Sequence, residues 1–219
     1  SYSQTNGTVD HPGIWNLAPS VPGQHTHMFL NYVDSGSSNI GGPIALGGGI
    51  VTTNWVIRLN ALSAGGNTYR FSCGLADGTT IQTNSDSYVN GVYFTYTDTV
   101  NSGNYQIRNT AASVTTTANT STAASTSFVT LSVVINAAGT SVAYYINGNQ
   151  VANSPIATNI PTAALTPFWQ MVNTAGTNPS VDVDLYWTTI ALSNPRPGPT
   201  PGTPPADNRL IRQYTPTAV

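Results

Sequence analysis

Two aspartates near the end of the chain have the spacing for acid–base chemistry. Asp182 and Asp184 alternate with valine in VDVDLYW, and side chains two apart on a strand lie on one face, about 7 Å apart along the strand. A glycosidase places two carboxyl groups on either side of the bond that it cleaves. The sequence contains no Glu, the residue that sandwich glycosidases usually employ as the acid with a raised pKa. We therefore interpret both aspartates as the solvent face of a last strand, and we expect no catalytic residue.

Clustered carboxylates are also what a hard cation such as calcium binds. Asp182 and Asp184 form one such pair, and Asp77 and Asp86, both in a polar loop, form another. Calcium binding at either pair is the less favoured alternative to a solvent-exposed polar face. We expect no metal and no cofactor.

Two of the three histidines form an H-x-H pair. His25 and His27 stand at the start of a strand expected over residues 26–33, so both rings point the same way. Two ligands from one chain do not make a metal site, although a three-fold assembly would bring six histidines together. The simpler interpretation is an exposed polar face. His11, which precedes Pro12 in an expected turn, is predicted to pack or bond locally.

The chain lacks the sequence signatures of a nucleophile or a nucleotide site. Cys73 lies in the alternating segment YRFSCGL, which predicts a small buried apolar residue rather than a reactive thiol. Because it is the single cysteine, no disulfide within the chain and no thiolate metal site can form. There is no G-x-S-x-G elbow, no P-loop and no dinucleotide fingerprint.

Charge excludes two classes of partner. Charged residues make up 6% of the 219 residues and the formal net charge is −2, so there is no basic field for nucleic acid and no polybasic patch for a membrane surface. No run of 18 apolar residues occurs, which predicts no membrane insertion. The first ten residues, SYSQTNGTVD, are polar and do not resemble a secretory signal.

Aromatic residues are the remaining candidates for ligand contact. Eleven Tyr and four Trp accompany many Asn and Thr, a combination typical of carbohydrate-binding surfaces, where sugar rings stack on aromatic faces and hydroxyls bond to amides. Three tryptophans in alternating strands are predicted to be core: Trp55, Trp169 and Trp187. Three tyrosines are the candidates for exposed glycan-binding residues: Tyr88, Tyr105 and Tyr186.

The elements that must position these residues are strands. The clearest segment is 128–160, where Val129, Leu131, Val133 and Ile135 alternate with more polar residues and two hairpin turns follow, at 136–139 and 147–148. The chain has no Glu and no Lys, and Thr, Ser, Asn, Val, Ile and Tyr dominate, which favours strands over helices. About a dozen strands joined by short turns predict an all-β, two-sheet antiparallel sandwich. The Thr-rich segment 113–126 is either an exposed edge strand or disordered.

Three parts are expected along the chain. Residues 1–24 form an irregular N-terminal arm with one short strand near 13–17, residues 25–193 form the sandwich, and residues 194–219 form a Pro-rich linker followed by an anchoring segment. The loops 77–88 and 98–104 are expected to present polar and aromatic groups. The terminal segment is either frayed or docks onto another subunit. Its candidate assembly residues are Arg209, Leu210, Ile211, Arg212 and Tyr214.

Several phrases, in order and spacing, resemble a domain that recurs in tailed-bacteriophage virion proteins and has a concanavalin A-like jelly roll. They are HPGIW at 11–15, LGGGIVTTNWVIRLNALS at 46–63, YRFSCGLAD at 69–77, NGVYFTY at 90–96, INAAGTSVAYYINGNQVA at 135–152, NIPTAALTP at 159–167 and VDVDLYWTTIAL at 181–192. The resemblance implies a lectin-like sandwich on a phage particle, of the head decoration or tail fibre type. It brings no catalytic residues, and the acidic metal motif of legume lectins is not matched.

The sequence thus predicts a non-enzymatic structural protein of the virion surface, a capsid decoration or fibre protein that forms a homotrimer. Its expected partners are other virion proteins, further copies of itself and bacterial surface glycans, to which it would attach the particle. One alternative is a carbohydrate-active enzyme on the same fold, a glycosidase or depolymerase. Another is a free secreted lectin.

Overall fold

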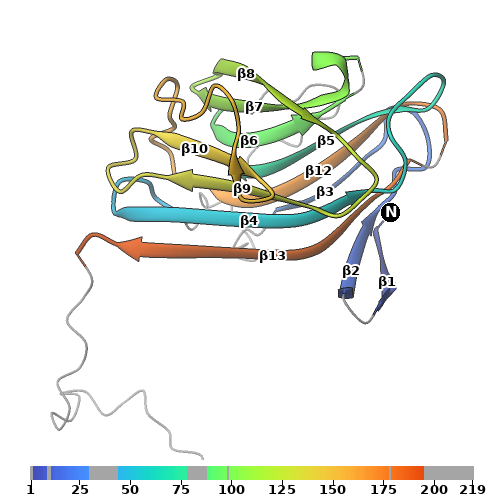
Figure 1. The fold of residues 1–219 in the computed structure, drawn as a ribbon, viewed down its shortest axis with the longest axis horizontal. Helices are drawn as coiled ribbons and strands as arrows, with labels where there is room; N and C mark the ends of the chain where they lie inside the picture. Colours follow the sequence, from blue (N-terminus) through green and yellow to red (C-terminus); the bar gives the residue numbers. More distant parts are fainter. Residues whose placement is uncertain are drawn as a thin grey trace, which may run out of the picture.

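The computed structural model describes residues 2–8, 11–29, 44–77, 88–97, 99–177 and 179–194. Two antiparallel sheets pack face to face, and a short 3-10 turn, η1 (Asn101–Gly103), joins two strands. This architecture confirms the predicted all-β, two-sheet jelly-roll sandwich (Figure 1). Among the described residues, no helix is long and apolar enough to cross a membrane.

The larger sheet has seven strands in the order β1-β2-β13-β4-β9-β10-β11, so the last long strand lies between the N-terminal hairpin and the middle of the chain. Figure 1 shows the β1–β2 hairpin projecting beside the start of β13. The strand bounds are β1 (Tyr2–Thr8), β2 (His11–Leu17), β4 (Gly49–Leu59), β9 (Val129–Ile135), β10 (Val142–Ile146), β11 (Asn149–Gln150) and β13 (Val181–Leu192).

The smaller sheet has six strands in the order β3-β12-β5-β6-β7-β8. The Thr-rich segment forms its last strand, which supports the edge-strand interpretation of that segment rather than disorder. The strand bounds are β3 (His25–Phe29), β5 (Thr68–Ala76), β6 (Gly91–Tyr96), β7 (Asn104–Ala111), β8 (Val114–Ala123) and β12 (Thr166–Ala175).

The segment 128–160 forms the predicted antiparallel meander. β9 and β10 pair from Val142 opposite Ile135 to Ile146 opposite Leu131, and the turn between them is closed by the Asn136 side chain, whose Oδ1 accepts hydrogen bonds from two backbone amides at 2.8 and 3.1 Å. Both turns end on a glycine with positive φ, 68° at Gly139 and 77° at Gly148, a conformation that costs glycine little.

The core follows from period-two alternation on facing strands. In β4, the inward residues Val51, Trp55, Ile57 and Leu59 are at most 1% exposed, whereas Ile50 on the other face is 43% exposed. Cys73 is fully buried, as predicted, and burial raises the pKa of its thiol well above the ordinary value. This thiol is therefore protonated and inert at neutral pH.

The N-terminal residues differ from the expected irregular arm. β1 and β2 pair over most of residues 2–17, and Leu17 of β2 lies opposite Val181 of β13. Leu17 and Ile14 are 1% and 4% exposed, so the apolar side chains of IWNL attach this segment to the sheet. The predicted short strand near 13–17 is the second half of β2, whereas β1 and the pairing of this hairpin with the larger sheet were not predicted from local patterns rich in Gly and Pro.

Candidate functional site

A bulge in β13 decides where the two aspartates lie. Asp182 pairs with Arg58 and Val183 with Ile57, but it is Leu185 that pairs with the next residue of β4, Val56. Asp184 is therefore an extra residue in the strand, and such a bulge reverses the alternation of the residues that follow. Beyond it, Tyr186 packs on the core, whereas Leu185 and Trp187 face outward and are 52% and 40% exposed. The prediction of a core Trp187 is corrected for this reason.

Asp182 is buried rather than on a solvent face. Its side chain accepts hydrogen bonds from the Asn16 amide at 2.7 Å and the Asn60 amide at 3.0 Å, and it forms an ion pair with Arg58 at 2.5 Å. The residue is 3% exposed. Because the bulge turns Asp184 away from this network, the two aspartates do not act as the matched pair that regular alternation predicts.

Asp184 instead lines a pocket of about 290 Å³ at the open side of the sandwich, which we call the edge pocket. One wall comes from β2 and β13 of the larger sheet, and the other from β3 and β12 of the smaller sheet. The lining residues are Gly13, Trp15, Met28, Trp169, Val183, Asp184, Leu185 and Tyr186.

The edge pocket combines aromatic rings with polar groups. The Trp15 side chain is 38% exposed, whereas Trp169 is 4% exposed and its buried Nε1–H has no hydrogen-bond acceptor among the described residues. The ring centroids of Trp169 and Tyr186 lie 5.9 Å apart, and those of Trp55 and Tyr186 lie 5.7 Å apart. The pocket thus offers a ring surface, an indole donor and the Asp184 carboxylate as an acceptor.

Tyr186 is the predicted glycan-binding tyrosine that lies in this pocket. It is half-buried, and its hydroxyl bonds to Thr188, whose own hydroxyl donates to Thr53 at 2.9 Å. Burial raises the pKa of Tyr186, and the hydrogen bonds to Thr188 and Thr53 partly offset that rise. The hydroxyl is therefore neutral at physiological pH.

The other two candidate tyrosines are buried, so their predicted exposure is corrected. Tyr88 is 1% exposed; its ring packs on Phe168 and Tyr93, and its hydroxyl donates to Gln170 Oε1 at 2.6 Å. Tyr105 is also 1% exposed and packs in the core against Phe94. Desolvation, with smaller contributions from Cys73 and Tyr96, raises the pKa of Tyr105.

His25 and His27 lie on β3, at the edge of the smaller sheet. Their rings stack at 5.3 Å between centroids with an angle of 25° between planes. Burial, and to a smaller extent the neighbouring His25, lowers the pKa of His27 below its ordinary value of 6.5. Over the part of the chain that the structure describes, no three His, Cys, Asp or Glu side chains come together as metal ligands.

The structure describes one half of the Asp77–Asp86 pair, which was considered as a calcium site. Asp77 is 7% exposed, and its Oδ2 accepts hydrogen bonds from the backbone and side-chain amides of Asn90 at 3.1 and 3.2 Å. Its proposed calcium partner, Asp86, lies outside the described residues, as do the assembly residues between 209 and 214.

The outer face of the smaller sheet carries polar side chains that bond to one another. Ser72 donates to Thr95 at 3.1 Å, and Gln106 donates to Asn119 at 2.6 Å, across neighbouring strands. These residues lie in register on β5, β6, β7 and β8. Because their hydrogen bonds are made within the sheet, this face has less capacity for a ligand than the edge pocket.

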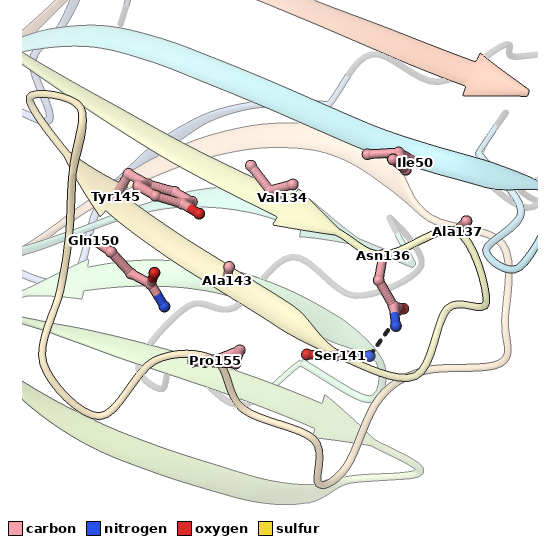
Figure 2. Close-up of a pocket in the computed structure, with 9 residues that line it drawn as sticks. All are labelled: Ile50, Val134, Asn136, Ala137, Ser141, Ala143, Tyr145, Gln150 and Pro155. Carbon is pink, nitrogen blue, oxygen red and sulfur yellow. Dashed lines mark hydrogen bonds between the residues drawn. The ribbon is translucent and has the colours of Figure 1, made fainter.

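The larger sheet has a second hollow on its outer face, which we call the sheet groove, with a volume of about 420 Å³. Its floor is formed by Val134 of β9 and the small side chain of Ala143 of β10, which lie side by side (Figure 2). Tyr145 and Gln150 stand at one end, and the turn at 136–141 closes the other. No motif in the sequence predicted this hollow, since it results from a small residue between larger ones across three strands.

No protein-family model and no curated protein matches the chain. Among solved structures, a protein of unknown function from Shewanella oneidensis MR-1 aligns with a TM-score of 0.56 at 14% identity, over 90% of this chain and 78% of the other. Alginate lyase AlyC3 in complex with dimannuronate aligns with a TM-score of 0.54 at 6% identity, over 83% of this chain and 76% of the lyase. The potassium-bound carbohydrate recognition domain of Emp46p aligns at 0.47 and 11% identity, over 75% and 88% of the two chains.

These similarities concern the fold. The chain has the concanavalin A-like, lectin-like β-sandwich, in agreement with the fold that the sequence resemblance implies. At such low identity, no residue role passes from these proteins to this one.

Proposed function

We propose that this chain is a non-enzymatic structural protein of a bacteriophage virion surface, a capsid decoration or fibre protein, which binds a sugar of the host cell in the edge pocket. The assignment to a virion is supported by the ordered sequence phrases that resemble phage virion domains. Sugar binding is supported by one observation of the structure, the meeting of Trp15, Trp169 and Asp184 in one open pocket.

Each group in the pocket matches a feature of a sugar ring. The C–H face of a pyranose packs on an aromatic surface such as Trp15, while a buried indole N–H such as that of Trp169 gains a partner when a hydroxyl approaches. The Asp184 carboxylate accepts hydrogen bonds from neighbouring hydroxyls. A volume near the lower end of the ligand-pocket range of about 300–1,000 Å³ suits a single sugar residue.

The carboxylate also restricts the class of sugar. An acidic sugar would bring a second negative charge next to Asp184, and two like charges in a partly desolvated site repel one another. The preferred ligand is therefore a neutral hexose or an N-acetylated amino sugar at a chain end. The dimannuronate in the alginate lyase complex is, in contrast, an anionic ligand.

The test measures binding of neutral and acidic glycans by isothermal titration calorimetry, with substitutions in and outside the pocket. Trp15→Ala should weaken binding about tenfold, equivalent to about 1.4 kcal/mol, and Asp184→Asn should weaken it as well. Trp187→Ala is the matched control, because Trp187 is similarly exposed on another face. Equal losses in Trp15→Ala and Trp187→Ala would contradict the site, as would binding of acidic glycans alone.

The assembly role belongs to the Pro-rich linker and terminal segment. Deletion of residues 194–219 should abolish incorporation into particles while glycan binding persists, because the deletion removes none of the strands that the structure describes. Incorporation of the truncated chain at the normal level would refute the anchoring role. Glycan binding without any association with particles would favour a free lectin.

The alternative of a carbohydrate-active enzyme has a separate test. Host polysaccharide is incubated with the protein and with Asp182→Asn and Asp184→Asn variants, and new chain ends are measured. Our proposal predicts no cleavage. Cleavage that disappears in the Asp184→Asn variant would replace the binding function by an enzymatic one.

A further inference from the structure

The sheet groove lies close to the point where the C-terminal part of the chain leaves the sandwich. Ala191, near the end of β13, pairs with Ile50 of β4, which lines the groove (Figure 2). The next strands across the sheet are β9 and β10, which form the groove floor. Two strand spacings, about 10 Å in all, therefore separate the exit of the chain from the groove.

The surface from the groove towards β13 is rich in exposed apolar groups. Ile50 is 43% exposed and lies beside the groove. Leu185 and Trp187 of β13 are 52% and 40% exposed and lie on the same outer face of the sheet as Tyr145. The strand register shows this, because Trp187 lies opposite Asn54, Asn54 opposite Ser132, and Ser132 opposite Tyr145. Thr52, Asn54 and Thr189 lie on the same face among these apolar side chains, and exposed apolar groups gathered on an outer sheet face are a mark of an interaction surface.

The polar groups at the groove ends suit a peptide. The Gln150 amide donates to the backbone carbonyl of Ser154 at 2.8 Å, and its Oε1 is an acceptor for an N–H group at this end of the groove. The half-buried Tyr145 ring can receive a guanidinium on its face. Of the residues that the structure describes, none with a carboxylate lines the groove, so an apolar peptide with arginines that stack fits it better than a polycationic one.

The terminal segment has this composition. Leu210, Ile211 and Tyr214 are apolar anchors, and Arg209 and Arg212 stand next to them. We infer that this segment of one copy docks in the sheet groove of a neighbouring copy, an inference that rests on the assembly role proposed above and names its receptor.

The linker favours a neighbouring copy over the same chain. Between residues 194 and 209 it has a proline at nearly every second position over most of its length, and a proline-rich chain extends by about 3.1 Å per residue, or about 45 Å in total. That length greatly exceeds the distance of about 10 Å to the groove of the same copy. Segments that pass from each copy to the next form a closed ring when the rotation closes, in agreement with the predicted trimer.

The test uses the full chain and two kinds of variant. Ala143→Arg fills the groove floor, and the double variant Leu210→Ser/Ile211→Ser removes two anchors; each should weaken self-association at least tenfold in analytical ultracentrifugation. Thr117→Arg, on an exposed position of β8, is the matched control and should associate as the original chain does. Thermal melts establish that all variants fold.

Mixing provides the decisive measurement. Ala143→Arg chains keep the terminal segment, and Leu210→Ser/Ile211→Ser chains keep the groove, so an equal mixture should recover two-chain complexes that neither variant forms alone. Unaltered association of Ala143→Arg, or no recovery in the mixture, would overturn the inference. Neither result affects glycan binding, which is measured separately at the edge pocket.

A crosslink distinguishes the source of the segment. Because Cys73 is fully buried, the pair Gln150→Cys and Tyr214→Cys introduces the reactive thiols, and oxidation should give covalent chains of two or more copies. A crosslink confined to single chains would reject docking between copies.

Discussion

At the scale of single residues, Asp182 shows how a carboxylate in an ordinary-looking strand becomes a structural centre. Its oxygens accept hydrogen bonds from the Arg58 guanidinium and from the side-chain amides of Asn16 and Asn60. Asn16 belongs to β2, Arg58 belongs to β4, and Asn60 directly follows β4. The carboxylate thus connects the N-terminal hairpin to the middle of the larger sheet.

Removal of this carboxylate should destabilise the fold and leave the edge pocket unaltered. Asp182→Ala leaves two amides and a guanidinium without their acceptor, at a cost of about 1–3 kcal/mol. The Arg58 side chain is 38% exposed, so water can hydrate its guanidinium in the variant and reduce the loss of stability. Urea denaturation measures the change in the free energy of unfolding, with glycan affinity as the control. A stability equal to that of the original chain would contradict this account.

His27 should make stability depend on pH. Desolvation and His25 hold its pKa below 6.5 in the folded state, so above pH 6.5 the ring is neutral in both states. As the pH falls below 6.5, the unfolded chain takes up a proton before the folded chain does, and stability decreases until the folded pKa is reached. Urea denaturation between about pH 7 and pH 4.5 should show a smaller decrease for His27→Gln than for the original chain. An identical pH profile in this variant would contradict the prediction.

The sequence predicted some single residues well and others poorly, for a physical reason. The burial of Cys73 was predicted correctly because the alternation of apolar residues in its own strand shows which side chains face the core. Tyr88 was not, because it precedes β6 and local pattern does not show that Phe168, from a strand distant in sequence, packs on its ring. The face of Trp187 was predicted from regular alternation, which the bulge at Asp184 reverses.

At the scale of elements, the strand pairing of β5 and β6 depends on a residue without a side chain. A Cβ on Gly74 would lie 2.3 Å from the Val92 carbonyl oxygen and 2.5 Å from the Tyr93 Cα. These are backbone atoms, which cannot move without displacing the pair of strands. The close approach lets the Tyr93 ring cross the neighbouring strand and pack on Phe168.

Gly74→Ala should therefore lower stability by about 1–3 kcal/mol or more, since overpacking forces backbone shifts. Gly66→Ala is the matched control, because a Cβ there meets no atom within 4 Å and its φ is not positive. Thermal unfolding of both variants measures the difference. Similar melting temperatures for the two variants would show that the backbone of β5 and β6 accommodates a Cβ at position 74 without loss of stability.

The elements themselves were largely predictable, and their pairing was not. The meander at 128–160 follows from alternation and turn residues that lie close together in sequence. The placement of β13 between β2 and β4, and of β12 between β3 and β5, depends on contacts between distant segments. The edge pocket arises from that placement, so the sequence alone could not predict that Trp15 and Trp169 line the same pocket.

At the scale of the whole molecule, scarce charge limits the interactions available for the proposed sugar ligand. The described residues that carry charge are few, and Asp182 and Arg58 neutralise one another. The proposed recognition of a sugar in the edge pocket therefore depends on stacking and hydrogen bonds, which salt screens weakly. The same scarcity leaves apolar surface on the larger sheet with few charges to keep copies apart.

Glycan affinity should accordingly change less than threefold between about 50 mM and about 500 mM sodium chloride, because ion pairing does not contribute. Titration calorimetry at several salt concentrations measures this. A steep loss of affinity with salt would indicate that charged groups dominate recognition and that the ligand is an anion.

The extra residue in β13 has a consequence for how related sequences can diverge. Val183 and Leu185 already face consecutive residues of β4, Ile57 and Val56, so removal of Asp184 alone would leave both registers intact. A gene that gains or loses this one codon would add or remove an acid at the mouth of the sandwich without altering strand pairing. Under the proposed function, proteins descended from one common sandwich can thus differ in sugar preference through a single inserted residue, without any change in the core.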